Sequence, residues 1–101
     1  MEFLVNIKIK WPEGMDPAEI ERISVEEREM AKILRAERKM LRMWRVPARR
    51  ENWGLWQADD ATHLHQIISA LPVWPYMDVN VLPLAYHPVD PRPHDEADVN
   101  A

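Results

Sequence analysis

The sequence predicts an α+β fold in which one antiparallel sheet of four strands carries two helices on one face. Three observations support this prediction. Residues 2–11 alternate between apolar and polar side chains, two later segments have the periodicity of amphipathic helices, and two short strand-like runs between them are joined by a connection of hairpin length. Together they give the order β-α-β-β-α-β.

In the first strand, residues 2–11, the apolar positions share one face: Phe3, Val5, Ile7, Ile9 and Trp11. Pro12 and Gly14 end this strand. Asp16 and Pro17 then open a helix, because aspartate is a good N-cap and proline fits the first helical position. We expect the helix to run to about Arg38.

The strand-like runs at 41–46 and 52–57 are separated by five residues, a length suited to a hairpin. Asp59 or Asp60 can cap the second helix, and its apolar positions follow helical spacing: Leu64, Ile67, Ile68 and Leu71. Prolines 72 and 75 stop it. A last strand over residues 78–86 completes the split βαβ, or ferredoxin-like, plan.

Both faces of the predicted sheet are partly apolar, since the strands carry Leu4, Trp44, Trp53, Leu55, Trp56 and Val81. A sheet with one solvated face would alternate more cleanly. We therefore expect the face without helices to pack against another copy of the chain, which predicts a homo-oligomer built from dimers through the sheet.

The 101 residues suit one domain, which we place at residues 1–88. Residues 89–101 are a Pro-rich, acidic tail, either disordered or packed on a neighbouring subunit. The chain has no cysteine, and no segment has the length and apolarity of a signal peptide or a membrane span. A cytoplasmic protein without membrane contact is expected.

Positive charge is concentrated in one part of a chain whose formal net charge is −4. Eight of the 13 basic residues lie between positions 32 and 50: Lys32, Arg35, Arg38, Lys39, Arg42, Arg45, Arg49 and Arg50. The overall acidity and the lack of a recognisable module argue against nucleic-acid binding. The cluster is either a solvated surface, or it includes arginines that hold a small carboxylate ligand.

Glu27 is the anomaly of the first helix. At 100° per residue it falls on the apolar stripe, which comprises Ile20, Ile23, Met30, Ala31 and Leu34. A carboxylate on that stripe is unfavourable unless it is paired, and burial raises its pKa, which suits a proton shuttle near neutral pH. The alternative is a glutamate that reaches solvent or pairs with an arginine.

Other polar candidates carry weaker signals. Asn52 lies beside Trp53 and Trp56 and could donate to a ligand oxygen, or it is an ordinary edge asparagine. His63 and His65 lie on opposite flanks of the second helix, so the four histidines predict no metal site. The alternative role for His65 is a hydrogen bond to a backbone carbonyl. Tryptophan side chains are more often found in a core or an interface than in a ligand-binding site.

Several runs resemble the muconolactone Δ-isomerase family. The start of the chain through Met15-Asp16-Pro17, the 41–46 run with Trp44-Arg45, Asn52 and Leu64-His65 each have a family counterpart. The most specific run is Leu71-Pro72-Val73-Trp74-Pro75-Tyr76-Met77-Asp78, followed by His87-Pro88. The likeness spans about residues 1 to 88.

The resemblance implies a ferredoxin-like subunit in a homo-oligomer, which in the family is a decamer built from dimers. It also implies a cofactor-free and metal-free isomerase of the β-ketoadipate pathway that converts muconolactone to 3-oxoadipate enol-lactone. Two departures stand out: Arg49-Arg50 replaces a His-Tyr pair, and Arg38 replaces a glycine. The first leaves a substituted lactone open as the substrate.

For such a reaction, Glu27 is our candidate proton shuttle. The substrate-binding candidates are Asn52, Arg50, Arg45, Trp56 and His65, with the choice between the arginines left open. Two alternatives remain at the level of sequence. One is a cofactor-free monooxygenase or cyclase of the same fold that acts on a related ring acid, and the other is a non-enzymatic oligomer that binds a small ligand.

Overall fold

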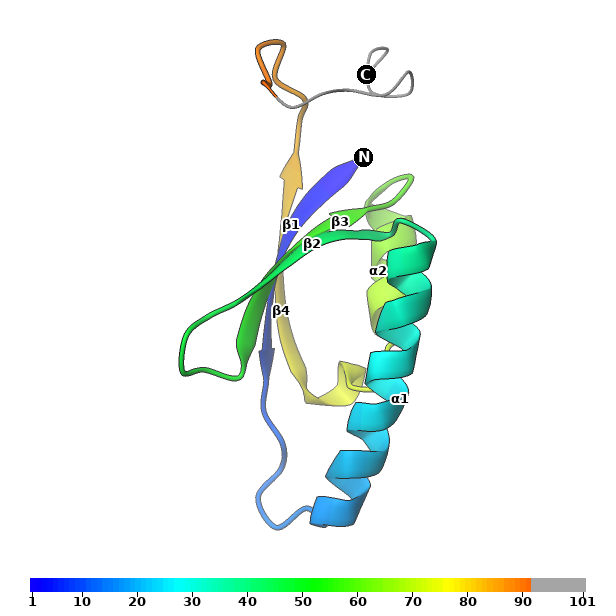
Figure 1. Cartoon of the computed structure of the whole chain (residues 1–101), viewed down its shortest axis with the longest axis vertical. Helices are drawn as coiled ribbons and strands as arrows, with labels where there is room; N and C mark the ends of the chain where they lie inside the picture. The colour runs from blue at the N-terminus through cyan, green and yellow to red at the C-terminus, as the bar shows by residue number, and fades with distance from the viewer. Residues whose placement is uncertain (92–101) are drawn as a thin grey trace.

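The computed structural model describes residues 1–91, so most of the predicted tail lies outside the described residues. Its elements follow the predicted order (Figure 1). They are β1 (Glu2–Ile9), α1 (Pro17–Ala36), β2 (Met40–Arg45), β3 (Glu51–Gln57), α2 (Ala61–Ser69), the 3-10 turn η1 (Trp74–Tyr76) and β4 (Met77–Leu84).

The four strands form one sheet in the order β2-β3-β1-β4, and every neighbouring pair is antiparallel. Both helices lie on the same side of this sheet, as Figure 1 shows. This is the predicted ferredoxin-like arrangement, and it is confirmed. Among residues 1–91, no helix is long and apolar enough to cross a membrane.

Each helix begins at an aspartate cap. The Oδ1 atom of Asp16 accepts from the Ala18 amide at 3.0 Å, and Pro17 occupies the first helical position. In α2 the cap is Asp60, whose Oδ1 accepts from the His63 amide at 2.8 Å. The choice that the sequence left open between Asp59 and Asp60 is thereby settled in favour of the latter.

Helix α1 ends two residues earlier than expected. The backbone of Arg38 is left-handed, with φ of 59°. The Lys39 amide donates to the Leu34 carbonyl at 2.9 Å and the Arg38 amide donates to Arg35 at 3.1 Å, a Schellman arrangement that closes the helix end. The left-handed position of this turn is usually occupied by glycine, and here Arg38 occupies it.

The strand ends also differ from the expectation. β1 stops at Ile9, so Trp11 leaves the sheet and packs its ring against Tyr76, with the centroids 5.0 Å apart. β4 begins one residue earlier, at Met77, and ends at Leu84 rather than at residue 86. β4 lies at the edge of the sheet, so it is hydrogen-bonded to a neighbouring strand, β1, on one side only.

The core lies between the sheet and the helices. Phe3, Val5 and Ile7 of β1 are at most 3% exposed. They pack with Leu34, Trp56, Ala58, Leu64, Ile68 and Leu71. This single layer of apolar contacts fixes α1 over the sheet and so positions every side chain that α1 directs inward.

The opposite face of the sheet exposes large apolar side chains. Trp44 and Trp53 are paired in register and are 44% and 39% exposed, and Leu82 of β4 is 57% exposed. Half-buried Leu4 lies between Leu55 and Leu82 in the register. We name these five residues the outer apolar face. Such a face is unusual on a surface that meets only water.

Candidate active site

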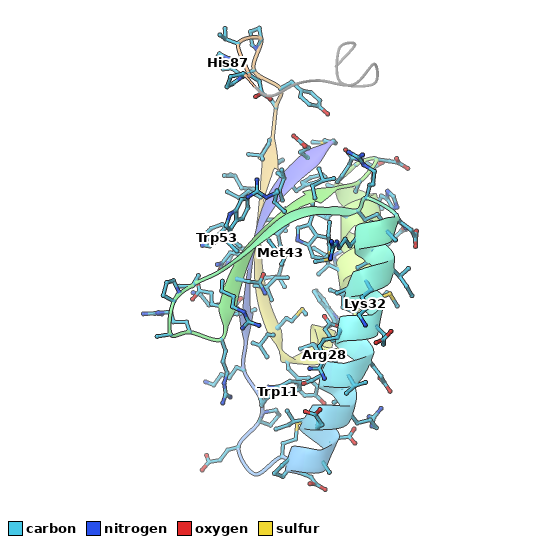
Figure 2. The ribbon with its side chains drawn as sticks, viewed as in Figure 1. Trp11, Arg28, Lys32, Met43, Trp53 and His87 are labelled. Atoms are coloured by element: carbon cyan, nitrogen blue, oxygen red, sulfur yellow. The ribbon has the colours of Figure 1, made fainter. Side chains whose placement is uncertain are left out.

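A cleft with a volume of about 620 Å³ opens between α1 and the sheet. Its walls come from α1, the end of β1, β2, β3 and the loop before β4. The lining residues are Ile9, Trp11, Ser24, Glu27, Arg28, Ala31, Met43, Trp44, Arg45, Arg50, Glu51, Asn52 and Val73. Figure 2 labels Trp11, Arg28 and Met43, which lie around the space between α1 and the sheet.

Glu27 projects into this cleft from the inner face of α1. Its side chain is half-buried, and its Oε2 atom is buried with no hydrogen-bond partner among the described residues. Burial raises the pKa of the Glu27 carboxyl, and a hydrogen bond from the Val73 backbone opposes that rise in part. The result is a carboxylate in the wall of the cleft that the Val73 backbone holds and whose Oε2 atom is buried without a partner among the described residues.

Asn52 faces Glu27's side of the sheet, because its register partners are Ile7 and Arg45. Its Oδ1 atom is buried and has no partner among residues 1–91. The strand position is fixed from behind, since the amide of Asn6 donates to the Asn52 carbonyl at 3.3 Å and to Glu51 Oε2 at 2.9 Å. Asn52 therefore offers the cleft a polar group that the protein leaves free.

Three arginine residues line the cleft: Arg28, Arg45 and Arg50. Neither Arg45 nor Arg50 forms an ion pair with a residue of the described chain. Arg49 differs from both, because its guanidinium approaches Glu51 at 3.9 Å and does not line the cleft. The free arginines make the cleft a place where a carboxylate can bind.

Sequence reasoning missed two members of this site. Arg28 falls outside the basic cluster at 32–50, and its guanidinium lies 3.6 Å from Glu21 on the exposed side of α1. Its long side chain nevertheless reaches the cleft. Val73 acts through its backbone amide, for which a side-chain pattern gives no signal.

The other two predicted substrate contacts do not line the cleft. Trp56 is 1% exposed and belongs to the core. His65 is exposed on α2, where its ring meets Trp74 edge-on at 5.9 Å beside a separate groove of about 260 Å³. Their roles in substrate binding stay predictions. Within residues 1–91, no three histidine or acidic side chains come together as a metal site would need.

Comparison with known proteins identifies the family of the chain. Residues 1–90 match the family model described as muconolactone delta-isomerase. The chain belongs to the muconolactone Δ-isomerase family. It is therefore an isomerase, and this membership favours isomerisation over the monooxygenase, cyclase and binding-module alternatives.

Individual members of the family are similar over nearly the whole chain. The muconolactone Δ-isomerase of Pseudomonas aeruginosa is 36% identical over 88 residues, which cover 87% of this chain and 92% of the relative. That of Cupriavidus pinatubonensis is 33% identical, with 87% and 96% covered. A crystal structure of a muconolactone isomerase superposes with a TM-score of 0.85 at 31% identity, covering 95% of this chain and 100% of that one.

Proposed function

We propose that this enzyme converts muconolactone, or a closely related carboxylate-bearing lactone, to the corresponding enol-lactone in the β-ketoadipate pathway. The observation that carries the proposal is the position of Glu27: a half-buried carboxylate with a raised pKa and a free oxygen in a cleft that also holds arginines. Isomerisation of such a lactone needs a base that removes a ring proton and a cation that binds the substrate carboxylate.

The reaction moves one proton and one double bond within a five-membered ring. The Glu27 carboxylate removes the proton from the ring carbon that bears the carboxymethyl arm. The electrons shift through the ring to give a dienolate, and the protonated Glu27 returns the proton to the carbon next to the lactone carbonyl. A single carboxylate can perform both steps when it stays on one side of the bound ring, and the position of Glu27 in one wall of the cleft supports this.

Burial of Glu27 suits both halves of this cycle. A carboxyl with an ordinary pKa is a weak base towards a carbon acid, whereas desolvation makes the carboxylate a stronger one. The Val73 hydrogen bond keeps the carboxylate oriented without neutralising it. The group is therefore poised to take up a proton and to give it back.

Other residues of the cleft bind the substrate and stabilise the charge that develops on it. Asn52 is a donor for the lactone carbonyl oxygen, where negative charge develops, once its side-chain amide is turned with the nitrogen towards the cleft. Arg45 or Arg50 holds the carboxylate of the carboxymethyl arm. The ring of Trp11 covers the apolar part of the substrate and excludes water, and Trp44 borders the cleft from the edge strand β2.

The test is a spectrophotometric assay of the purified protein with muconolactone. We expect turnover without oxygen uptake by the wild type, and a loss of at least about 10³-fold in kcat for Glu27→Gln. The matched control is Glu26→Gln, since Glu26 is exposed on the same helix and pairs with Arg22 at 2.8 Å. Full activity in Glu27→Gln would refute the mechanism, and oxygen consumption would redirect the proposal to a monooxygenase.

We also propose that the enzyme is a cytoplasmic homo-oligomer whose dimers form through the outer apolar face and assemble into a decamer through other contacts. The exposure of Trp44, Trp53 and Leu82 supports a contact there. Trp44 additionally lines the cleft, so a second copy packed on this face would help to close the site.

A further inference from the structure

The indole nitrogen of Trp56 is an unsatisfied donor in the core. Trp56 is 1% exposed, and its Nε1 atom is buried without a hydrogen-bond partner among the described residues. A buried indole N–H usually finds an acceptor, and leaving one unpaired destabilises the fold. An unpaired donor of this kind calls for an explanation.

The donor edge of this ring points along the sheet towards the cleft. Asn52, Gly54 and Trp56 occupy alternate positions of β3 and share the face that carries the helices. The indole leans back over Gly54, because a Cβ atom built on Gly54 would lie 2.7 Å from Nε1 and 3.1 Å from Cδ1. The N–H edge of the ring therefore lies on the side of Trp56 that faces Asn52.

Gly54 is what makes this orientation possible. Any side chain at position 54 would collide with the indole, and β3 would then present three side chains in a row on this face. With glycine, the space between Asn52 and Trp56 stays free of β3 side chains. The backbone at Gly54 needs no unusual φ, so the requirement is one of space alone.

Met43 separates the indole edge from the open part of the cleft. It is the register partner of Gly54 on β2, it lines the cleft, and its Sδ atom approaches the same Cβ position at 2.6 Å. Its side chain is 40% exposed. An unbranched thioether that is partly exposed can change rotamer at little cost, so a ligand can displace it.

We propose that the indole N–H of Trp56 donates a hydrogen bond to the lactone carbonyl oxygen of the bound substrate, with Met43 moving aside as the ring enters. Trp56 and Asn52 then form a pair of donors across Gly54, opposite Glu27 on α1. The indole keeps its proton throughout. Only Glu27 transfers one, and the Trp56 hydrogen bond strengthens as the carbonyl oxygen gains charge in the dienolate.

A neutral, rigid donor suits this position. The substrate carries a carboxylate as well as a carbonyl, and a cation beside the carbonyl would compete with Arg45 and Arg50 for the carboxylate. The indole attracts the carbonyl oxygen without offering that alternative. Its orientation is fixed by the core, so no reorganisation is needed when charge develops.

The experiment removes the N–H while keeping the ring. In the full-length enzyme, Trp56 is replaced by phenylalanine (Trp56→Phe) and, separately, by β-(3-benzothienyl)alanine, in which sulfur takes the place of the N–H in a ring of nearly the same shape. We expect both replacements to lower kcat on muconolactone by about 10²-fold or more, with a much smaller change in KM. The benzothienyl variant decides the matter if the phenylalanine variant folds poorly.

The control is Trp74→Phe, because Trp74 packs against His65 outside the cleft. We expect its kcat to stay within about twofold of the wild type. The indole ¹H–¹⁵N resonance of Trp56 gives a second readout, and it should move downfield when a lactone inhibitor binds, whereas that of Trp74 should not.

This inference rests on the proposed function, and the two can fail separately. If the wild type does not turn over muconolactone, the proposed function fails. If the wild type is active and the benzothienyl variant retains its kcat, the role of Trp56 is refuted. The proposed role of Glu27 as the proton shuttle is not affected by that result. An unchanged Trp56 indole resonance in the inhibitor complex would refute it too.

Discussion

The Glu27 carboxylate accepts a hydrogen bond from the backbone of Val73, which joins the first helix to the loop before the last strand. Val73 is 2% exposed and sits in the run Leu71-Pro72-Val73-Trp74-Pro75-Tyr76. The Tyr76 and Trp74 amides donate back to the carbonyls of Val73 and Leu71, at 2.8 and 3.0 Å. The most family-like stretch of the sequence thus forms a rigid turn that holds the carboxylate at one oxygen.

Glu27→Gln should make the protein more stable at neutral pH while it inactivates the enzyme. The pKa of Glu27 is raised in the folded state, so its contribution to stability is complete below the ordinary carboxyl pKa and is lost as the pH rises through the folded pKa. Glutamine avoids that loss. We expect a melting temperature a few degrees higher at pH 7 and none of this gain near pH 3.

Differential scanning fluorimetry across this pH range measures the difference. Glu26→Gln serves as the matched variant, because Glu26 is exposed and loses only a surface ion pair with Arg22. A stability gap between Glu27→Gln and the wild type that does not widen with pH would contradict the raised pKa.

The pH profile of the wild type should have an acid limb set by Glu27. Only the carboxylate form is a base, so kcat/KM should fall as the pH drops below the folded pKa of Glu27. Because burial raises that pKa above the ordinary carboxyl value, the limb should lie at higher pH than for an ordinary glutamate. A Val73→Pro variant removes the amide that opposes the rise, and the limb should then move further up in pH. A limb at or below the ordinary value in the wild type would argue against Glu27 as the base.

Arg50→Gln should weaken substrate binding more than Arg49→Gln. Arg50 lines the cleft without a carboxylate partner, whereas Arg49 already faces Glu51 and lies outside the cleft. A charge-assisted hydrogen bond contributes about 1.5–3 kcal/mol, which corresponds to a rise in KM of roughly 10- to 150-fold. Steady-state kinetics of both variants beside Arg45→Gln identifies which arginine holds the carboxylate. Equal, small effects in all three would mean that Arg28 or a neighbouring subunit provides the cation.

How far the sequence predicts this site depends on the kind of signal each residue carries. Glu27 was found because the 3.6-residue period alone places it on the buried stripe, and the fold was found because strand and helix periods differ. Asn52 was found through its neighbours and a family motif. Both residues can be predicted from residue type and spacing in the sequence.

The remainder could not be read in this way. Val73 contributes a backbone group, and every residue has one. Arg28 belongs to the solvated face by its angle, and only the length of its side chain brings it to the cleft. The unpaired N–H of Trp56 depends on a ring orientation that Gly54 and Met43 decide together. Such relations exist only in three dimensions.

Arg38→Gly should stabilise the protein. Arg38 adopts φ of 59°, a left-handed conformation that costs a residue with a Cβ about 1 kcal/mol and glycine almost nothing. Its position at the Schellman turn does not use the side chain, because the bonds there are between backbone groups. We expect a gain of about 0.5–1 kcal/mol in the free energy of unfolding, measured by urea denaturation at fixed protein concentration.

The paired variant for this prediction is Arg35→Gly in the last helical turn. Glycine has no conformational advantage there and should cost about 1 kcal/mol. Ala48→Gly offers an independent repeat, because Ala48 also has positive φ, at 61° in the turn between β2 and β3. Destabilisation by Arg38→Gly would show that the arginine side chain makes a contact that outweighs the backbone strain.

Leu82→Asn should dissociate the oligomer that we propose. Leu82 is 57% exposed on the edge strand β4 of the outer apolar face, opposite Leu4 in the register and away from the core. If a second copy covers this face, asparagine places an unpaired amide in the contact and removes apolar area, at a cost of about 1–3 kcal/mol in each copy. Leu82→Met keeps the apolar area and should assemble normally. Sedimentation equilibrium of both variants beside the wild type measures the change, and an unchanged assembly in Leu82→Asn would place the subunit contact elsewhere on the molecule.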